Sequence, residues 1–87
     1  MGQPLGNWER SEDYGALQRV IDSLFSNQES VRRLDAVIMA ETLDLPEDLL
    51  EIVNLLPPGN YSRQSMCTQL NSAIAAHAWG QVYGMVE

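Results

Sequence analysis

The chain has 87 residues with 12 acidic and five basic side chains, so its formal charge is -7 at pH 7. A domain of this size buries roughly 60 to 65% of its unfolded surface, which supports one modest core and excludes a second domain. The 45% apolar content is typical of a folded domain and argues against disorder. The acidic balance disfavours a general nucleic-acid or membrane binder, because contacts with phosphates need positive charge.

The numbers of cysteines and lysines limit the cellular compartment and the catalytic chemistry that we expect for the protein. Cys67 is the sole cysteine, so no intrachain disulfide can form and a reducing compartment is the simpler expectation. Lysine is absent, which excludes Schiff-base chemistry. The longest apolar run, from Ala36 to Ala40, has five residues against the roughly 20 of a membrane helix. The N-terminus does not resemble a secretory signal, and the sequence predicts a cytoplasmic protein without a membrane partner.

Residues 1–12 are rich in glycine, proline and polar side chains and predict a flexible lead-in to a single helical domain over residues 13–87. A first helix is expected after a Ser11 cap. Its apolar face consists of Tyr14, Leu17, Val20, Ile21, Leu24 and Phe25.

A second helix is predicted to begin at Ser26, because Glu29 three residues later completes the spacing of a capping box. Its expected buried stripe consists of Val31, Leu34, Val37 and Ile38. Arg32 and Arg33 follow Glu29 at helical spacing, and Asp35 follows Arg32 in the same way. We therefore expect neighbouring acids on this helix to neutralise both arginines.

A third helix is predicted from Pro46, in the first helical position, to about Leu56, where residues 57–60 end it. The fourth is expected to start after a Ser62 cap, with Tyr61 and Met66 at the spacing of a hydrophobic staple, and to stop at Gly80.

Residues 81–87 can either lie across the helices or pair as a strand, and the sequence leaves both open. The fold class that follows is all-α, a compact bundle of about four short helices with a short C-terminal extended tail.

Reactive side chains are too few to suggest catalysis. His77 is the only histidine and is expected to be partly buried on the fourth helix, while Cys67 is expected to act as a small buried hydrophobe. The two are ten residues apart, about 15 Å along a helix, which is too far for a nucleophile and its base. The sequence predicts neither an enzyme, nor a metal site, nor a cofactor.

The acidic residues are concentrated in one stretch. Six acids and no base lie from Asp35 to Glu51. On a helical wheel four of them share one exposed side, called here the acidic face: Asp44, Glu47, Asp48 and Glu51. Acids favour the positive end of a helix dipole, so a merely solvated helix start explains the pattern as well as a partner-binding surface does.

The same region resembles a helix-turn-helix. Ala40, Leu43, Leu45, Leu50 and Val53 have the apolar spacing of that motif, although Asp44 stands at the turn where glycine is usual. Its second helix would present acids to phosphates, so DNA recognition through this helix is disfavoured.

The outer side of the fourth helix, called here the polar face, is a second candidate interface. It consists of Gln64, Thr68, Gln69, Asn71 and Ser72, with Ser65 beside them. Such uncharged groups can read base edges, with Arg63 as a phosphate anchor and residues 81–87 as a wing. The same face can equally pack on another protein or a second copy of the chain.

The leading hypothesis is a non-catalytic interaction module that docks its acidic face on a basic surface of a protein partner. Such a module would inhibit by imitating phosphate charge in a nucleic-acid-binding groove, the mechanism class of some anti-restriction and anti-CRISPR proteins. The alternative is a small helix-turn-helix-like, DNA-associated regulator that uses the fourth helix and tail as a dimer. The third option is a subunit or homodimer component that uses the polar face of the fourth helix as its oligomer interface.

Overall fold

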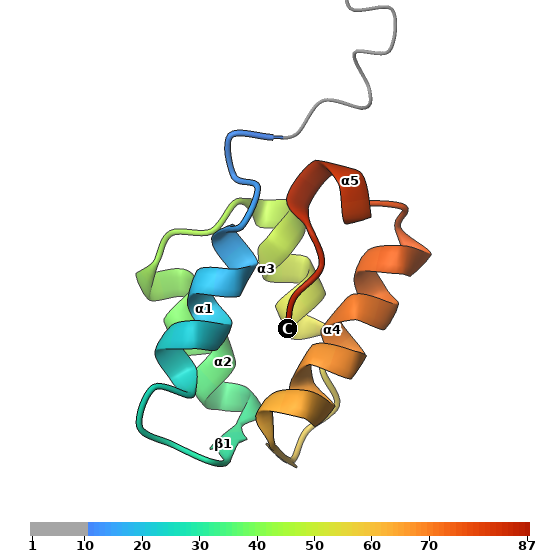
Figure 1. Cartoon of the computed structure of the whole chain (residues 1–87). Coiled ribbons are helices and arrows are strands. Elements are labelled where there is room, and N and C mark those ends of the chain that lie inside the picture. The colour runs from blue at the N-terminus through green and yellow to red at the C-terminus, as the bar shows by residue number, and fades with distance from the viewer. Residues whose placement is uncertain (1–10) are drawn as a thin grey trace, which may run out of the picture.

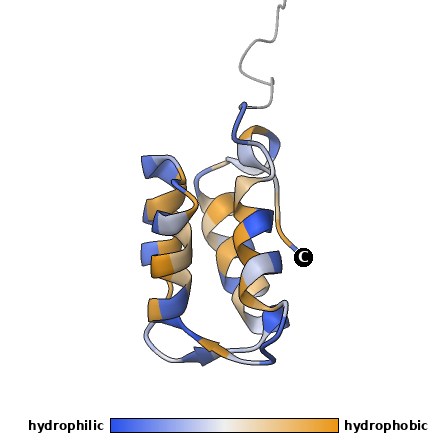
Figure 2. Cartoon of the chain, turned by 90° about the vertical axis from the view of Figure 1, so that its left-hand side faces the viewer, coloured by the Kyte–Doolittle hydropathy of each residue, from blue (hydrophilic) through white to orange (hydrophobic). Residues whose placement is uncertain are grey.

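The computed structural model describes residues 11–87. Within them the chain forms helices α1 (Ala16–Leu24), α2 (Arg33–Thr42), α3 (Glu47–Asn54), α4 (Arg63–Ala76) and α5 (Gly80–Tyr83), and strands β1 (Val31–Arg32) and β2 (Asn60–Tyr61). The strands and α5 lie at opposite ends of the molecule (Figures 1 and 2). The predicted all-α class is confirmed as a mostly helical fold with one tiny antiparallel ribbon. The expected lead-in lies mainly outside the described residues.

Helix α1 has the amphipathic pattern that the sequence predicts, but it starts later. Leu17, Val20, Ile21 and Leu24 are buried in the core, as expected. Ser11 does not cap the helix; its hydroxyl accepts a hydrogen bond from the Asp13 N–H at 2.9 Å within a preceding turn. Gly15 precedes α1 with φ 87°, a left-handed conformation that glycine adopts without steric cost. Tyr14 consequently lies before the helix and is 37% exposed.

The predicted second helix is wrong in its start and in half of its buried stripe: Val31 is buried and Val37 partly buried, but Leu34 and Ile38 are not. Residues 26–30 form a loop, and β1 follows, pairing Val31 with Tyr61 of β2. Helix α2 therefore begins only at Arg33. Leu34 and Ile38 are each 51% exposed, while the alanines of α2, Ala36 and Ala40, are buried. Alanine lets a helix approach its neighbours closely, so these two alanines provide the buried side of α2 where it packs against α1 and α3, with Val37 and Met39 partly buried beside them.

Arg33 ties α2 to the end of α3, which the sequence did not indicate. Its Nε donates to the carbonyl of Leu56 at 2.8 Å, and its Nη2 to the carbonyl of Asn54 at 3.0 Å. The last carbonyls of a helix lack partners within it and carry the negative end of the dipole. Arg33 satisfies one of them, that of Asn54, so of the two arginines only Arg32 pairs with a nearby acid, Asp35, at 3.2 Å. Pro46 is the N-cap of α3 rather than its first residue.

Helix α4 starts as predicted and ends early. The Ser62 hydroxyl accepts from the Ser65 N–H at 3.1 Å, and Tyr61 and Met66 are both buried. The helix ends at Ala76, and Ala78, with φ 58°, takes the left-handed position that the sequence assigned to Gly80. The N–H groups of Ala78 and Trp79 donate to Ala75 and Ile74, the pattern of a Schellman motif.

The left-handed backbone of Ala78 leads us to expect that a substitution at this position will stabilise the protein. Left-handed backbone costs a non-glycine residue about 1 kcal/mol or more, so Ala78→Gly should raise the free energy of unfolding by about 0.5–1 kcal/mol. Ala76→Gly, in the last helical position, should lower it by about the same amount. Urea denaturation of both variants checks the pair, and a loss of stability in both would contradict the account.

Residues 84–87 follow α5 and lie between α1 and α4 (Figure 1). The predicted extended tail is wrong for residues 81–83, which belong to α5, and residues 84–87 lie across the helices; no strand forms within residues 81–87. No helix in the described range is long and apolar enough to cross a membrane.

Candidate functional site

The four residues of the acidic face are all exposed. Glu47 and Asp48 occupy the first turn of α3, and Glu51 follows one turn later, opposite the buried Leu49 and Val53. Asp44 lies outside the helix, in the turn between α2 and α3, so its wheel position was wrong although its exposure was not. Buried side chains on the inner side of α3 hold its carboxylates on a fixed element.

None of these four carboxylates has a cationic partner in residues 11–87. The ion pairs in that range are Arg32 with Asp35 and Arg63 with Asp22. Arg33, which reaches α3, binds the carbonyls at its C-terminal end instead. Within the part of the chain that the structure describes, the negative charge of the acidic face is therefore not compensated by an ion pair.

Asp48 differs from the other three acids because it has a structural contact. The Tyr83 hydroxyl of α5 donates to its carboxylate at 2.9 Å. Burial, and secondly this carboxylate, raise the pKa of Tyr83 above its ordinary value. Asp48 thus links α3 to α5. Of the four carboxylates of the acidic face, those of Asp44, Glu47 and Glu51 have no hydrogen-bond partner in the described chain.

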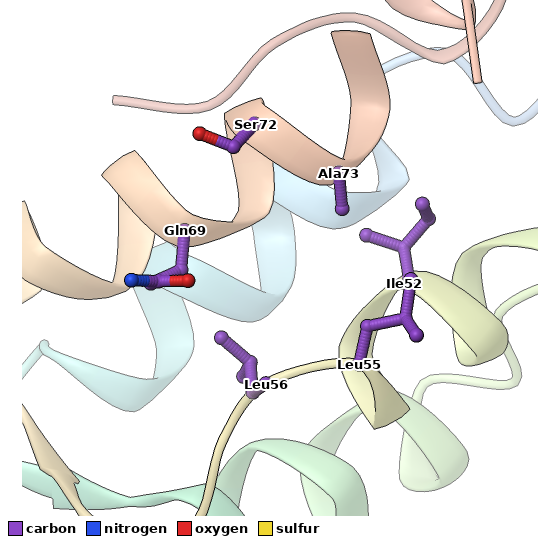
Figure 3. A pocket seen from close by; sticks show the side chains of 6 residues that line it. All are labelled: Ile52, Leu55, Leu56, Gln69, Ser72 and Ala73. Carbon is purple, nitrogen blue, oxygen red and sulfur yellow. The ribbon is translucent and has the colours of Figure 1, made fainter. Parts of the chain in front are cut away.

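The polar face of α4 is divided rather than continuous. Asn71 is occupied by the main chain of Val86. Gln69 and Ser72 line a pocket of about 240 Å³ between α4 and the end of α3 (Figure 3). Its other lining residues are Ile52, Leu55, Leu56 and Ala73. Gln64, Thr68 and Asn71 border a separate hollow on the side of residue 87, so three of the five residues do lie together. The structure therefore does not bring all five predicted residues together.

The predicted phosphate anchor of α4 is also engaged. Arg63 pairs with Asp22, and its guanidinium donates to the main-chain oxygen of Glu87 at 2.9 Å. Arg63 must break these two interactions before its guanidinium can bind a phosphate. The polar face of α4 therefore lacks the free phosphate-binding cation that the sequence predicts for it.

The turn of the helix-turn-helix resemblance has a relevant backbone feature. Asp44 adopts φ 57°, so an aspartate here takes a left-handed conformation that usually favours glycine. The helix that follows it exposes Glu47, Asp48 and Glu51. The corner can thus present a helix to a partner, with a charge that suits a basic surface rather than DNA.

His77 and Cys67 behave differently from one another. His77 is exposed at the end of α4 and stacks on Trp79 with ring centroids 4.5 Å apart, so the predicted partial burial is wrong. His77 is the C-cap of α4, beyond the last helical residue, so its ring does not share the buried side of the helix. Cys67 is buried as expected. Among residues 11–87 no three His, Cys, Asp or Glu side chains are grouped so that they could hold a metal ion.

Burial raises the pKa of the Cys67 thiol above its ordinary value of 9.0. Since only the thiolate attacks, Cys67 should react with a disulfide reagent at pH 8 at least about tenfold more slowly in the native protein than in the urea-unfolded chain. Absorbance of the released thiolate measures both rates. Equal rates would show that the thiol is accessible and not buried.

No protein-family model, curated protein or solved structure matches this chain.

Proposed function

We propose that the protein is a non-catalytic interaction module that docks its acidic face on a basic surface of a partner protein. One observation carries the proposal: four exposed carboxylates are gathered on α3 and the turn before it, without a cation paired to them in residues 11–87. Uncompensated charge on a rigid helix attracts a complementary surface and speeds the encounter with it.

A nucleic-acid-binding groove is the basic surface that fits best. Glu47 and Glu51 are four residues apart on one helix, so their Cβ atoms are about 5–6 Å apart, and Asp44 adds a further exposed carboxylate in the turn before the helix. Lysine and arginine side chains that bind successive phosphates can bind such a row of carboxylates instead. The protein would then act as an inhibitor by charge mimicry. The lone Cys67 fits a reducing compartment, and we place this activity in the cytoplasm.

Competition with nucleic acid tests the proposal. Immobilised wild-type protein should capture its partner from a lysate of its source cells at 50 mM salt and release it as salt rises. Fluorescence anisotropy should then show the wild-type protein displacing labelled DNA or RNA from the purified partner. A partner that holds the protein and the nucleic acid together, or that binds no nucleic acid, would contradict charge mimicry.

A further inference from the structure

Residues 84–87, called here the strap, are held mainly by side chains that bind its main chain. Asn71 of α4 donates to the carbonyl of Val86 at 2.9 Å and accepts from its N–H at 2.8 Å. Gln18 of α1 donates to the main-chain oxygen of Glu87 at 2.8 Å and accepts from its N–H at 2.9 Å. Each side-chain amide therefore binds both the backbone N–H and the backbone oxygen of one strap residue.

Two of the four strap residues, Gly84 and Val86, also contribute through their size, because Val86 belongs to the hydrophobic core. Gly84 and Val86 are buried, whereas Met85 is 52% exposed and Glu87 is exposed. Alternate burial is typical of an extended segment, in which successive side chains point to opposite sides. A Cβ at Gly84 would lie 3.1 Å from the Tyr14 ring, so only glycine fits there with ease. The site that holds the strap is called here the seat. It requires glycine at residue 84 and a valine-sized side chain at residue 86, and it accepts any residue at positions 85 and 87.

The seat itself is built from residues on two separate helices. Gln18 comes from α1, and Asn71 and Arg63 come from α4, with Arg63 as the second side chain that donates to the Glu87 oxygen. Figure 1 shows the strap running between these helices. Paired amides and a guanidinium, aimed at a backbone and accompanied by one apolar socket, are the elements of a peptide-binding site.

We propose that this seat is a recognition site for an extended peptide segment of the pattern Gly-x-Val-x, occupied by the protein's own strap and accessible to the same pattern in a partner protein. The contacts read the backbone, so a segment from another chain satisfies them equally well. A tethered strap competes at high effective concentration, and a partner segment therefore binds more tightly once the strap is displaced.

Displacing the strap in the full chain tests this proposal. Val86→Asp puts a charge into the apolar socket and should expel the strap. Met85→Asp adds the same charge one residue away, at an exposed position, and is the matched control. The probe is a fluorescein-labelled hexapeptide with the sequence of residues 82–87, measured by anisotropy.

The peptide should bind the Val86→Asp protein saturably and at least about tenfold more tightly than it binds wild type or Met85→Asp. Adding Asn71→Ala should weaken that binding about tenfold, because one amide of the seat is lost. Gly84→Val expels the strap by steric conflict with Tyr14 and replaces Val86→Asp should the latter unfold.

Three results would overturn the proposal. The first is the absence of saturable binding to both displaced variants while circular dichroism shows them folded. The second is binding that Asn71→Ala leaves unchanged. The third is a wild-type dimer in sedimentation that Val86→Asp dissociates, which would assign the seat to the strap of a second copy.

Discussion

Truncating Arg33 to alanine is expected to lower the free energy of unfolding by about 2–3 kcal/mol. The side chain donates to the carbonyls of Asn54 and Leu56, where α3 ends. A hydrogen bond from a charged donor contributes about 1.5–3 kcal/mol, and its removal leaves helix-terminal carbonyls with one partner fewer. The same change detaches the start of α2 from the end of α3, so both helices lose support.

Two further variants make this expectation specific. Arg33→Lys should be intermediate, because an ammonium lacks the planar fork that reaches both carbonyls. Arg19→Ala removes an exposed arginine without a side-chain hydrogen bond in the described chain and should change stability by less than about 0.5 kcal/mol. Urea denaturation measures all three. Equal stability of the Arg33→Ala and Arg19→Ala proteins would refute the role of Arg33.

Neutralising three residues of the acidic face is expected to weaken partner binding about 10- to 100-fold at 50 mM salt. The variant is Asp44→Asn, Glu47→Gln and Glu51→Gln together. An exposed ion pair contributes about 0.5–1 kcal/mol, and three of them account for that range. Asparagine tolerates the left-handed backbone at residue 44, so the turn should survive.

Asp48 is deliberately retained in this variant. It accepts the hydrogen bond of Tyr83, so replacing it would disturb the contact between α3 and α5 as well as the charge. A matched variant, Glu12→Gln, Glu29→Gln and Glu87→Gln, removes the same number of charges from exposed positions elsewhere. The comparison therefore separates the position of the charge from its total.

Features determined by neighbouring residues could be predicted from the sequence. The buried face of α1 repeats at helical spacing, and Ser62 lies next to the N–H groups that it caps, so both were correct. The start of α2 was missed because β1 pairs with β2, almost thirty residues away in the chain. Its buried alanines were missed for a related reason, since large apolar residues on its other side dominate the pattern.

The candidate site shows the same division. Exposure of the acids follows from composition and spacing, and was predicted. The contact between Asp48 and Tyr83, and the use of Asn71 and Gln18 by the strap, depend on tertiary packing that brings distant residues together. No local pattern marks an amide that will bind a backbone rather than a partner, so the polar face looked continuous in the sequence.

The affinity of the purified partner for the two charge variants, measured by isothermal titration at 50 mM salt, tests the central claim most directly. With Asp44, Glu47 and Glu51 neutralised, the dissociation constant should rise about 10- to 100-fold, while the matched variant should bind within about threefold of wild type. Equal affinities of the two variants, with both folded, would show that the acidic face is solvated surface and not the docking site.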